Sequence, residues 1–462
     1  MTSIDRKLLD DKISLPSPLI HMMHGCPLYT IPDLAKEIDN YYLGQFDITY
    51  LATKYTEQVP FCSLHKKSPW QLNILSGRHM TDGVTFCSGS NGGLTINLSG
   101  GRVILSNKDY IQKASRENFE VIISMADEVP FHTSKKKNQH SYERTMRWFL
   151  ELRSSPLIDW NSTKIFGVAV GGLEPEKIAL MAQTLLKEGA HGVVIGGAGM
   201  GETLEERQAA LIAVRTAVGP NVPILIQGMR TITDIVDALR HGADLIGSDY
   251  PKTLSDSGRA ALWWADAWNS MQKNDADLSN LTPDEESVIE GGCVQSVYKK
   301  AKCEPAHYVQ QEHAQLALSS SSQSEDDCDS SATNKPDSRR LINLWDEKFR
   351  KDPRPMMPGC ACHACRSHSR AYIHHLLRAK ELLSEVLIYT HNQHQLFSLF
   401  KVIKNKWVSV PSNYLSISRS ANVSVASAVT EVGISMIESN QEDIQCSMIS
   451  ISRETYMQSI EE

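Results

Sequence analysis

The fold is decided by a stretch that begins Lys164-Ile-Phe-Gly-Val-Ala-Val170-Gly171-Gly172 and repeats this pattern as far as Asp249. Each repeat is a short apolar run, a glycine-rich turn and, after all but the last turn, an amphipathic run with helical spacing. The apolar runs are predicted as strands over residues 164–170, 192–195, 223–227 and 244–246. The amphipathic runs are predicted as helices over residues 175–188, 204–218 and 231–241. Alternating strands and helices favour parallel strands joined by right-handed crossovers.

The same pattern extends toward the amino terminus. Residues 121–126 are predicted as a strand that ends at Asp127-Glu128, and residues 46–51 as another. A TIM-type (β/α)8 barrel needs about 250 residues, and residues 15–270 supply them. We therefore predict an α/β protein with such a barrel, whose functional pocket lies where the carboxyl ends of the strands meet.

A second motif, Cys360-Ala-Cys362-His-Ala-Cys365, predicts a metal site together with His391. Three thiolates and one imidazole complete a tetrahedral zinc shell and leave no position for a reactive water, so one structural Zn²⁺ is expected. A single helix between Cys365 and His391 would hold the ligands roughly 30 Å apart. The chain must therefore reverse, and we expect the break at residues 378–381.

Composition and charge limit the class of protein. The chain has 462 residues, 41% of them hydrophobic, and a net charge of −7, which indicates a sizeable core and disfavours wholesale capture of nucleic acid. We expect the one dense basic run, Lys135-Lys136-Lys137, to be a solvated loop. No apolar run is long enough for a transmembrane helix and no targeting segment is recognised, so a reducing compartment is expected.

Changes in composition suggest the domain boundaries. We expect an amino-terminal extension over residues 1–14, the barrel over 15–315 and a helical zinc-binding subdomain over 341–407. Residues 316–340 are acidic and serine-rich, and residues 408–462 are also serine-rich, so both segments are predicted to be disordered.

The cluster Gly197-Ala-Gly199-Met-Gly201 imitates a dinucleotide-binding turn between a strand and a helix. The acid that would hold a ribose hydroxyl about 20 residues further on is missing, because the next strand ends at Gln227-Gly228. We therefore expect no nicotinamide cofactor.

These motifs resemble the tRNA-guanine transglycosylases, also called queuine tRNA-ribosyltransferases, over most of residues 15–405. The resemblance rests on the zinc motif with its continuation Arg370-Ala-Tyr-Ile-His-His-Leu-Leu, on the preceding Asp352-Pro-Arg-Pro-Met-Met-Pro-Gly359, and on the glycine turns after residues 170 and 195. It implies a (β/α)8 barrel with a carboxyl-terminal zinc subdomain. It also implies exchange of guanine for a deazapurine at the anticodon wobble position of tRNA.

The resemblance further implies two catalytic aspartates, and this chain lacks both. Gly247 stands where the family has its nucleophile, and Ser90 stands where the second aspartate opens its motif. Val170 replaces a glutamine that recognises the base. Asp127 matches the family's base-holding aspartate, and it serves equally well as a structural remnant. Asp249, two residues beyond the nucleophile position, shares its strand face and is the one alternative nucleophile.

We therefore predict no catalytic residues in this chain, and a zinc shell that is intact. This combination resembles the noncatalytic accessory subunit of the family's eukaryotic enzymes. It implies a heterodimer with a catalytic subunit, formed through the zinc subdomain, and a role in holding tRNA. Cytoplasmic work, with attachment to the outer mitochondrial membrane through partners, is also implied. The alternatives are an active enzyme that uses Asp249, and a zinc-stabilised RNA-binding protein without an enzymatic partner.

Overall fold

The structure is a computed structural model of the whole chain. It describes residues 7–9, 12–23, 26–27, 42–46, 71–78, 88–98, 101–117, 119–262 and 341–409. Residues 263–315, the predicted disordered segment 316–340 and residues 410–462 lie outside these ranges. Within the predicted amino-terminal extension, β1 (Lys7–Leu8) and β2 (Ile13–Ser14) form an antiparallel pair.

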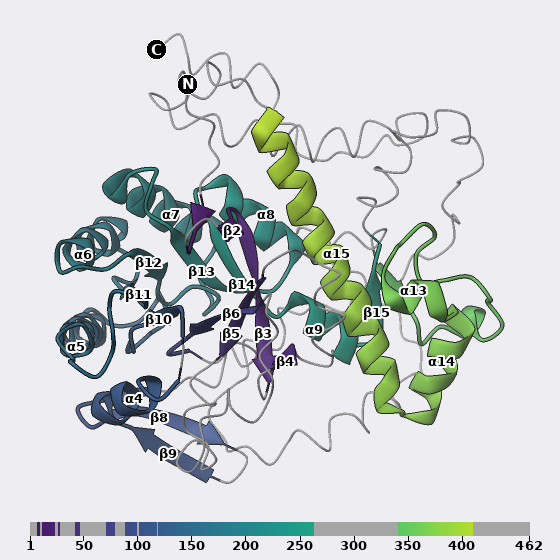
Figure 1. Ribbon diagram of the computed structural model, residues 1–462, viewed down its shortest axis with the longest axis horizontal. Coiled ribbons are helices and arrows are strands. Elements are labelled where there is room, and N and C mark those ends of the chain that lie inside the picture. The colour runs from purple at the N-terminus through teal and green to yellow at the C-terminus, as the bar shows by residue number, and fades with distance from the viewer. Residues whose placement is uncertain are drawn as a thin grey trace, which may run out of the picture.

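Eight parallel strands form a closed barrel, as predicted (Figure 1). In chain order they are β3 (Ser17–Met23), β5 (Tyr42–Phe46), β6 (Gln71–Leu75), β10 (Val121–Ile123), β11 (Lys164–Ala169), β12 (Gly192–Ile195), β13 (Ile224–Met229) and β14 (Leu245–Ser248). Each pairs with its sequence neighbours, and β14 closes the ring on β3 with Leu245 opposite Ser17. A short strand, β4 (Cys26–Pro27), pairs antiparallel with the end of β3.

The strands predicted after residue 120 are confirmed, whereas the strand predicted at residues 46–51 overlaps the described part of the chain only at Phe46. The structure has β5 at Tyr42–Phe46, and residues 47–51 lie outside the described ranges. All five β5 residues are buried, including the polar Gln45, so the strand does not read as a purely apolar run. A barrel strand that carries a buried glutamine escapes a search for apolar runs.

The helices that follow the strands cover the outside of the barrel. They are α4 (Asn107–Ala114), α5 (Lys135–Arg153), α6 (Pro175–Lys187), α7 (Leu204–Val218), α8 (Ile232–Arg240) and α9 (Tyr250–Asp256). Between β6 and β10 the chain also forms a small antiparallel sheet of β7 (Ser88–Ser90), β8 (Gly93–Leu98) and β9 (Gly101–Leu105).

The basic run at Lys135–Lys137 is the first turn of α5, so its prediction as a loop is wrong. The Ser134 hydroxyl accepts a hydrogen bond from the Lys137 N–H and caps the helix. Trp148 and Phe149 bury the opposite face against the barrel. The three lysine side chains are exposed, as a solvated segment requires.

A smaller lobe, which carries the predicted metal ligands and is called the metal-binding lobe below, stands beside the barrel (Figure 1). It consists of β16 (Leu341–Asn343), the 3-10 helix η4 (Glu347–Phe349), α13 (His363–Ser367), α14 (Arg370–Ala379) and the first turns of α15 (Leu382–Ser409). β16 pairs with β15 (Arg259–Ala261), which follows α9. The chain reverses at Lys380, which adopts a left-handed conformation with φ 57°, so the predicted break is confirmed.

Helix α15 joins the two parts of the molecule. Leu387 and Ile388, near its start, belong to the apolar core of the lobe. Leu396, Phe397, Phe400 and Ile403, two to four turns further on, belong to the core of the barrel. One helix, α15, therefore contributes side chains to both the core of the lobe and the core of the barrel.

Candidate metal centre and barrel mouth

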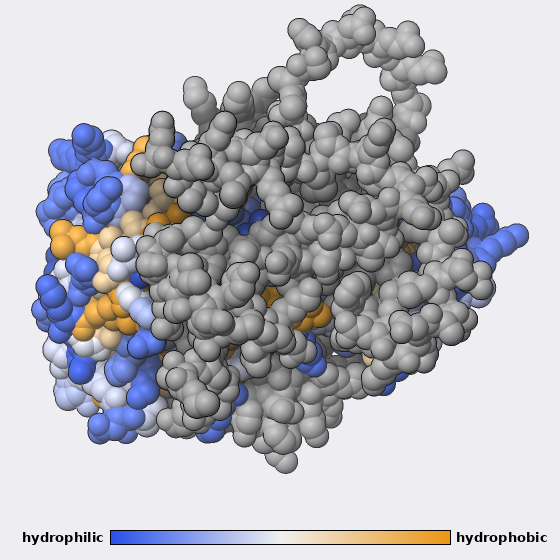
Figure 2. Space-filling model, turned by 90° about the horizontal axis from the view of Figure 1, so that it is seen from above, coloured by the Kyte–Doolittle hydropathy of each residue, from blue (hydrophilic) through white to orange (hydrophobic). Residues whose placement is uncertain are grey.

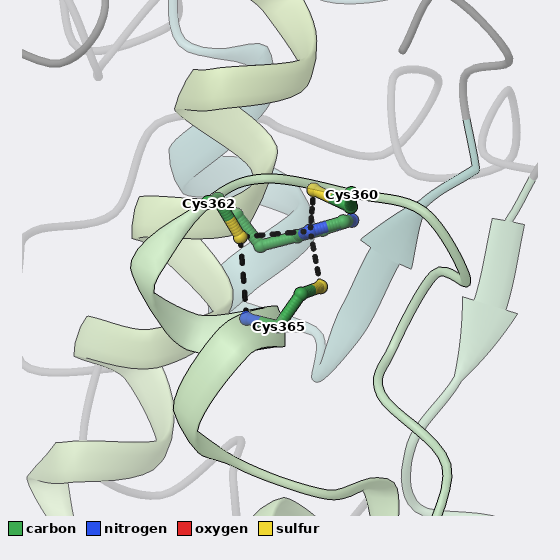
Figure 3. A group of neighbouring side chains, drawn as sticks. Cys360, Cys362 and Cys365 are labelled. Carbon is green, nitrogen blue, oxygen red and sulfur yellow. Dashed lines mark hydrogen bonds between the residues drawn. The ribbon is translucent and has the colours of Figure 1, made fainter. Parts of the chain in front are cut away.

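Four buried side chains converge in the lobe (Figure 3). Nδ1 of His391 lies 3.7 Å from Sγ of Cys360, 3.5 Å from Sγ of Cys362 and 3.3 Å from Sγ of Cys365, and all four atoms lie within 4.8 Å of one another. Tetrahedral zinc with bonds of about 2.0 to 2.3 Å separates its nitrogen and sulfur ligands by about 3.5 Å. The four atoms therefore fit a metal ion, and they are the four residues predicted from the sequence.

The imidazole of His391 is held for this task by the barrel. Its Nε2 donates a hydrogen bond to the carbonyl of Ala261 at 2.7 Å, which fixes the ring with Nδ1 facing the thiols, so Nδ1 is the atom that would bind a metal. The next residue, Asn392, accepts a hydrogen bond from the Ala261 N–H at 2.8 Å and donates to the Arg259 carbonyl at 3.0 Å. The metal centre is thus bound to β15 through two adjacent side chains of α15.

The loop before Cys360 is fixed by a buried ion pair. Arg370 contacts the carboxylate of Asp352 at 3.1 Å and donates to the Met356 carbonyl at 3.0 Å. Burial alone would raise the pKa of Asp352, but hydrogen bonds from Arg354 and Arg370 outweigh burial and lower the pKa to about 2. Asp352 is therefore ionised at neutral pH, and the loop that presents the first thiol is rigid.

Gly247, the residue that the sequence comparison matched to the family's nucleophile, lies near the carboxyl end of β14. A Cβ atom on Gly247 would lie 3.0 Å from Cγ of Gln227 and 3.3 Å from Oε1 of Gln45. Gln227 is held there by a hydrogen bond to the Ser76 hydroxyl at 3.1 Å. The space beside Gly247 is therefore occupied by two glutamine side chains.

Asp127 is engaged by this chain's own groups. One carboxylate oxygen pairs with Nη1 of Arg144, and the other accepts the Gly89 N–H at 2.8 Å. The Asp127 side chain is 5% exposed and that of Arg144 is 16% exposed. Asp127 thus connects the small sheet to α5 and offers neither oxygen to a ligand in this arrangement.

The other two pocket positions are also occupied within the fold. Ser90 is exposed, and its hydroxyl donates to the Gly93 carbonyl at 3.1 Å inside the β7–β8 hairpin. Val170 is buried, and its Cγ1 lies 2.7 Å from where a Cβ on Gly196 would stand. Neither residue offers a carboxylate or an amide.

Backbone N–H groups of the glycine cluster after β12 donate hydrogen bonds to two carboxylates of the same chain. Glu128 accepts from Gly197 at 2.8 Å, and Glu202 accepts from Gly199 at 2.7 Å and Met200 at 2.9 Å. These amides are of the kind that bind a pyrophosphate at a helix start, and here they are hydrogen-bonded to two glutamates of the same chain.

Asp249 is the remaining carboxylate near Gly247. It is 9% exposed, and its Oδ1 atom is buried without a hydrogen-bond partner. Burial raises its pKa to about 6, although the positive charges of Arg230 and Arg78 act in the opposite direction. Asp249 is thus a destabilising buried acid.

We predict that Asp249→Asn stabilises the protein at pH 7 and not at pH 4. A pKa raised from 3.8 to about 6 corresponds to about 3 kcal/mol. The folded state binds more protons than the unfolded chain between these values, so wild-type stability falls as the pH rises through this window. Urea unfolding of both proteins at pH 4 and pH 7 measures the difference. An equal effect of the substitution at both pH values would contradict it.

Two residues at these sites were missed from the sequence. Gln395 donates a hydrogen bond to Sγ of Cys360 at 3.2 Å. It lies four residues after His391 on the same helix, so helical spacing would have placed it on the metal-facing side. Arg144 pairs with Asp127, which lies on a different element, and no sequence motif or periodicity predicts this contact.

Comparison with known proteins agrees with this geometry. A sequence profile of queuine tRNA-ribosyltransferase matches residues 28–407. The chain is 27% identical over 414 residues to the queuine tRNA-ribosyltransferase accessory subunit 2 of Xenopus tropicalis, covering 86% of this chain and 89% of that protein. The human protein of the same name is 25% identical over 401 residues, with 83% of each chain covered. A queuine tRNA-ribosyltransferase of Dinoroseobacter shibae is 26% identical over 330 residues, covering 70% of this chain and 65% of that enzyme. The chain belongs to the queuine tRNA-ribosyltransferase family.

Proposed function

We propose that this chain is the noncatalytic accessory subunit of a heterodimeric queuine tRNA-ribosyltransferase, which exchanges guanine for queuine at the anticodon wobble position. The observation that carries the proposal is Gly247, which has no side chain at the position corresponding to the family's nucleophile and has Gln227 and Gln45 as its nearest neighbours there. Base exchange requires a carboxylate that attacks the ribose and a second one that assists. The names of the Xenopus and human relatives support the same role.

The proposed roles of the two subunits follow from which parts of the family's fold and site this chain contains. The barrel and the metal-binding lobe are complete, whereas the groups for chemistry are absent from the positions that correspond to the family's catalytic pair. The catalytic subunit would supply both aspartates and extract the base from the single-stranded anticodon loop. This chain would dimerise and hold the tRNA, giving one active site per heterodimer.

The metal is proposed to be one structural Zn²⁺. Three cysteines and one histidine are a typical closed zinc shell, and zinc accepts their tetrahedral arrangement without strain. All four ligands are protein side chains, so the ion would organise the lobe and take no part in base exchange.

The lobe is proposed as the surface that meets the catalytic subunit. Its apolar side chains Trp345, Tyr372, Leu382 and Leu383 are 39 to 63% exposed. An open hollow of about 570 Å³ next to Tyr372 is lined by Pro353, Pro355 and His368 among others. Exposed aromatic and leucine side chains beside a hollow are typical of a protein interface.

A second apolar surface provides the matched control for this interface. Figure 2 shows apolar residues among polar ones on the side of the molecule where α5, α6 and α7 lie in Figure 1. Leu180 of α6, for example, is 58% exposed. An aspartate at Leu180 therefore tests a change of the same kind on the barrel instead of the lobe.

We predict that Tyr372→Asp weakens assembly with the catalytic subunit at least about 30-fold, because a buried aromatic anchor at an interface contributes about 2 kcal/mol or more. Leu180→Asp should leave assembly unchanged. Sedimentation of mixtures over a range of concentrations gives both dissociation constants. If Leu180→Asp weakens assembly and Tyr372→Asp does not, the interface lies on α6 and not on the lobe.

Cytoplasmic location, with peripheral attachment to the outer mitochondrial membrane through partners, is part of the proposal. In the described residues no helix is long and apolar enough to cross a membrane. Cell fractionation with and without depletion of the catalytic subunit tests whether that partner directs the attachment.

Guanine exchange into a wobble-guanosine tRNA tests the role of the chain. We expect exchange only when the catalytic subunit is added, and Asp249→Asn should leave the rate of the mixture within about twofold of wild type. Exchange by this chain alone, lost in Asp249→Asn, would instead establish the alternative enzyme. Tight, salt-dependent tRNA binding without any assembly would favour the RNA-binding alternative.

A further inference from the structure

Bound zinc with this ligand set would carry an excess negative charge inside the lobe. Three thiolates and a neutral imidazole around Zn²⁺ leave a net charge of −1, and His391 is fully buried. A buried charge without compensation is costly. The thiolates therefore need hydrogen-bond donors, and these decide how tightly the ion is held.

Two N–H groups donate to the thiol sulfurs in the part of the chain that the structure describes. The Cys365 N–H lies 3.3 Å from Sγ of Cys362, which caps the start of α13. This donor belongs to the backbone, so any side chain at residue 365 would supply it. The second donor is the side-chain amide of Gln395, whose Nε2 lies 3.2 Å from Sγ of Cys360.

The position of Gln395 fixes the direction of this contact. The residue is completely buried, and it follows His391 by one helical turn, so α15 aims both side chains at the metal site. A metal-bound thiolate only accepts hydrogen bonds, so the amide must turn its NH₂ group to the sulfur. Its carbonyl Oε1 is buried and has no hydrogen-bond partner among the described residues, so the contact to sulfur is the one that this amide makes there.

We propose that Gln395 is a positioning residue of the metal centre, whose amide stabilises the Cys360 thiolate and raises the affinity of the lobe for Zn²⁺. The hydrogen bond lowers the basicity of the sulfur, so protons compete less well with the metal. It also reduces the nucleophilicity of Cys360 and protects the ligand against oxidation or alkylation.

Gln395→Met tests this inference, because methionine fills nearly the same volume and has no N–H. The expected result is a 10- to 100-fold loss of Zn²⁺ affinity in chelator competition, the usual effect of removing such a partner. Release of the ion on acidification should begin at a higher pH. In the Co²⁺-loaded protein the sulfur-to-cobalt charge-transfer band should shift while its intensity still reports three thiolates.

Gln393→Met is the matched control. Gln393 lies one half-turn away on α15, is 3% exposed and has an unpartnered Nε2, so its replacement also removes a buried amide but no contact to sulfur. It should leave the affinity and the cobalt spectrum unchanged. Equal affinities in all three proteins, or equal losses in both variants, would overturn the proposal.

A second substitution at residue 395 distinguishes loss of the N–H donor from a general folding defect. Gln395→Glu keeps the size of the side chain and places a carboxylate against the thiolate, so its zinc affinity at neutral pH should fall below that of Gln395→Met. A Gln395→Glu protein that binds zinc as tightly as wild type at every pH would also contradict the role of the N–H donor.

Discussion

Replacement of Cys362 by serine is expected to release the metal ion and unfold the metal-binding lobe. Structural zinc contributes an apparent ~10–16 kcal/mol in zinc-finger peptides, and the lobe has a small apolar core of its own. The loss should extend to the barrel, because His391 and Asn392 tie α15 to β15. We predict a loss of at least ~5 kcal/mol in the free energy of unfolding.

Metal content by mass spectrometry and urea unfolding measure this effect together. His363→Ala is the matched control, because His363 lies between the cysteines in sequence but is not one of the four grouped ligands. It should retain one metal ion per chain and near wild-type stability. A Cys362→Ser protein that keeps its metal, or that loses it without loss of stability, would refute the structural role.

Replacement of Arg144 by methionine is the second large effect that we expect. It removes the cation that pairs with the buried carboxylate of Asp127. Breaking a buried ion pair on one side costs about 3–5 kcal/mol, because the remaining charge is left without a partner. The variant should therefore be strongly destabilised in urea.

The double variant Asp127→Asn/Arg144→Met makes this prediction specific. Removing both charges should recover most of the lost stability, since no buried charge remains. This result would identify Asp127 as a structural residue and not as a holder of a base. Two results together would instead support a working pocket. The double variant would stay destabilised, and the wild-type protein would bind a base that Asp127→Asn no longer binds.

The sequence allowed the barrel to be predicted where glycine turns separate apolar runs, from β10 to β14. Most of β5 was not predicted, because the buried Gln45 interrupts the apolar pattern. The first turn of α5 was missed, because three exposed lysines precede the first buried residue of that helix, Ser141. The four residues of the candidate metal centre could all be predicted, since cysteine spacing is a local signal.

The contacts that fill the barrel mouth could not be predicted in the same way. Arg144 reaches Asp127 and Gln227 reaches Ser76 only because the closed barrel brings distant segments together. Such pairs leave no periodicity in the sequence. The sequence therefore predicted which positions lack a carboxylate, and the structure adds the contacts that Gly247 and Asp127 make.

Whether this chain is catalytic is measured by guanine exchange into wobble-guanosine tRNA. The assay uses this chain alone and this chain mixed with a catalytic queuine tRNA-ribosyltransferase subunit. Denaturing electrophoresis should follow for a covalent RNA adduct on either polypeptide. We predict exchange only in the mixture, with any adduct on the catalytic subunit. Exchange by this chain alone, or an adduct on it, would contradict the assignment as a noncatalytic subunit.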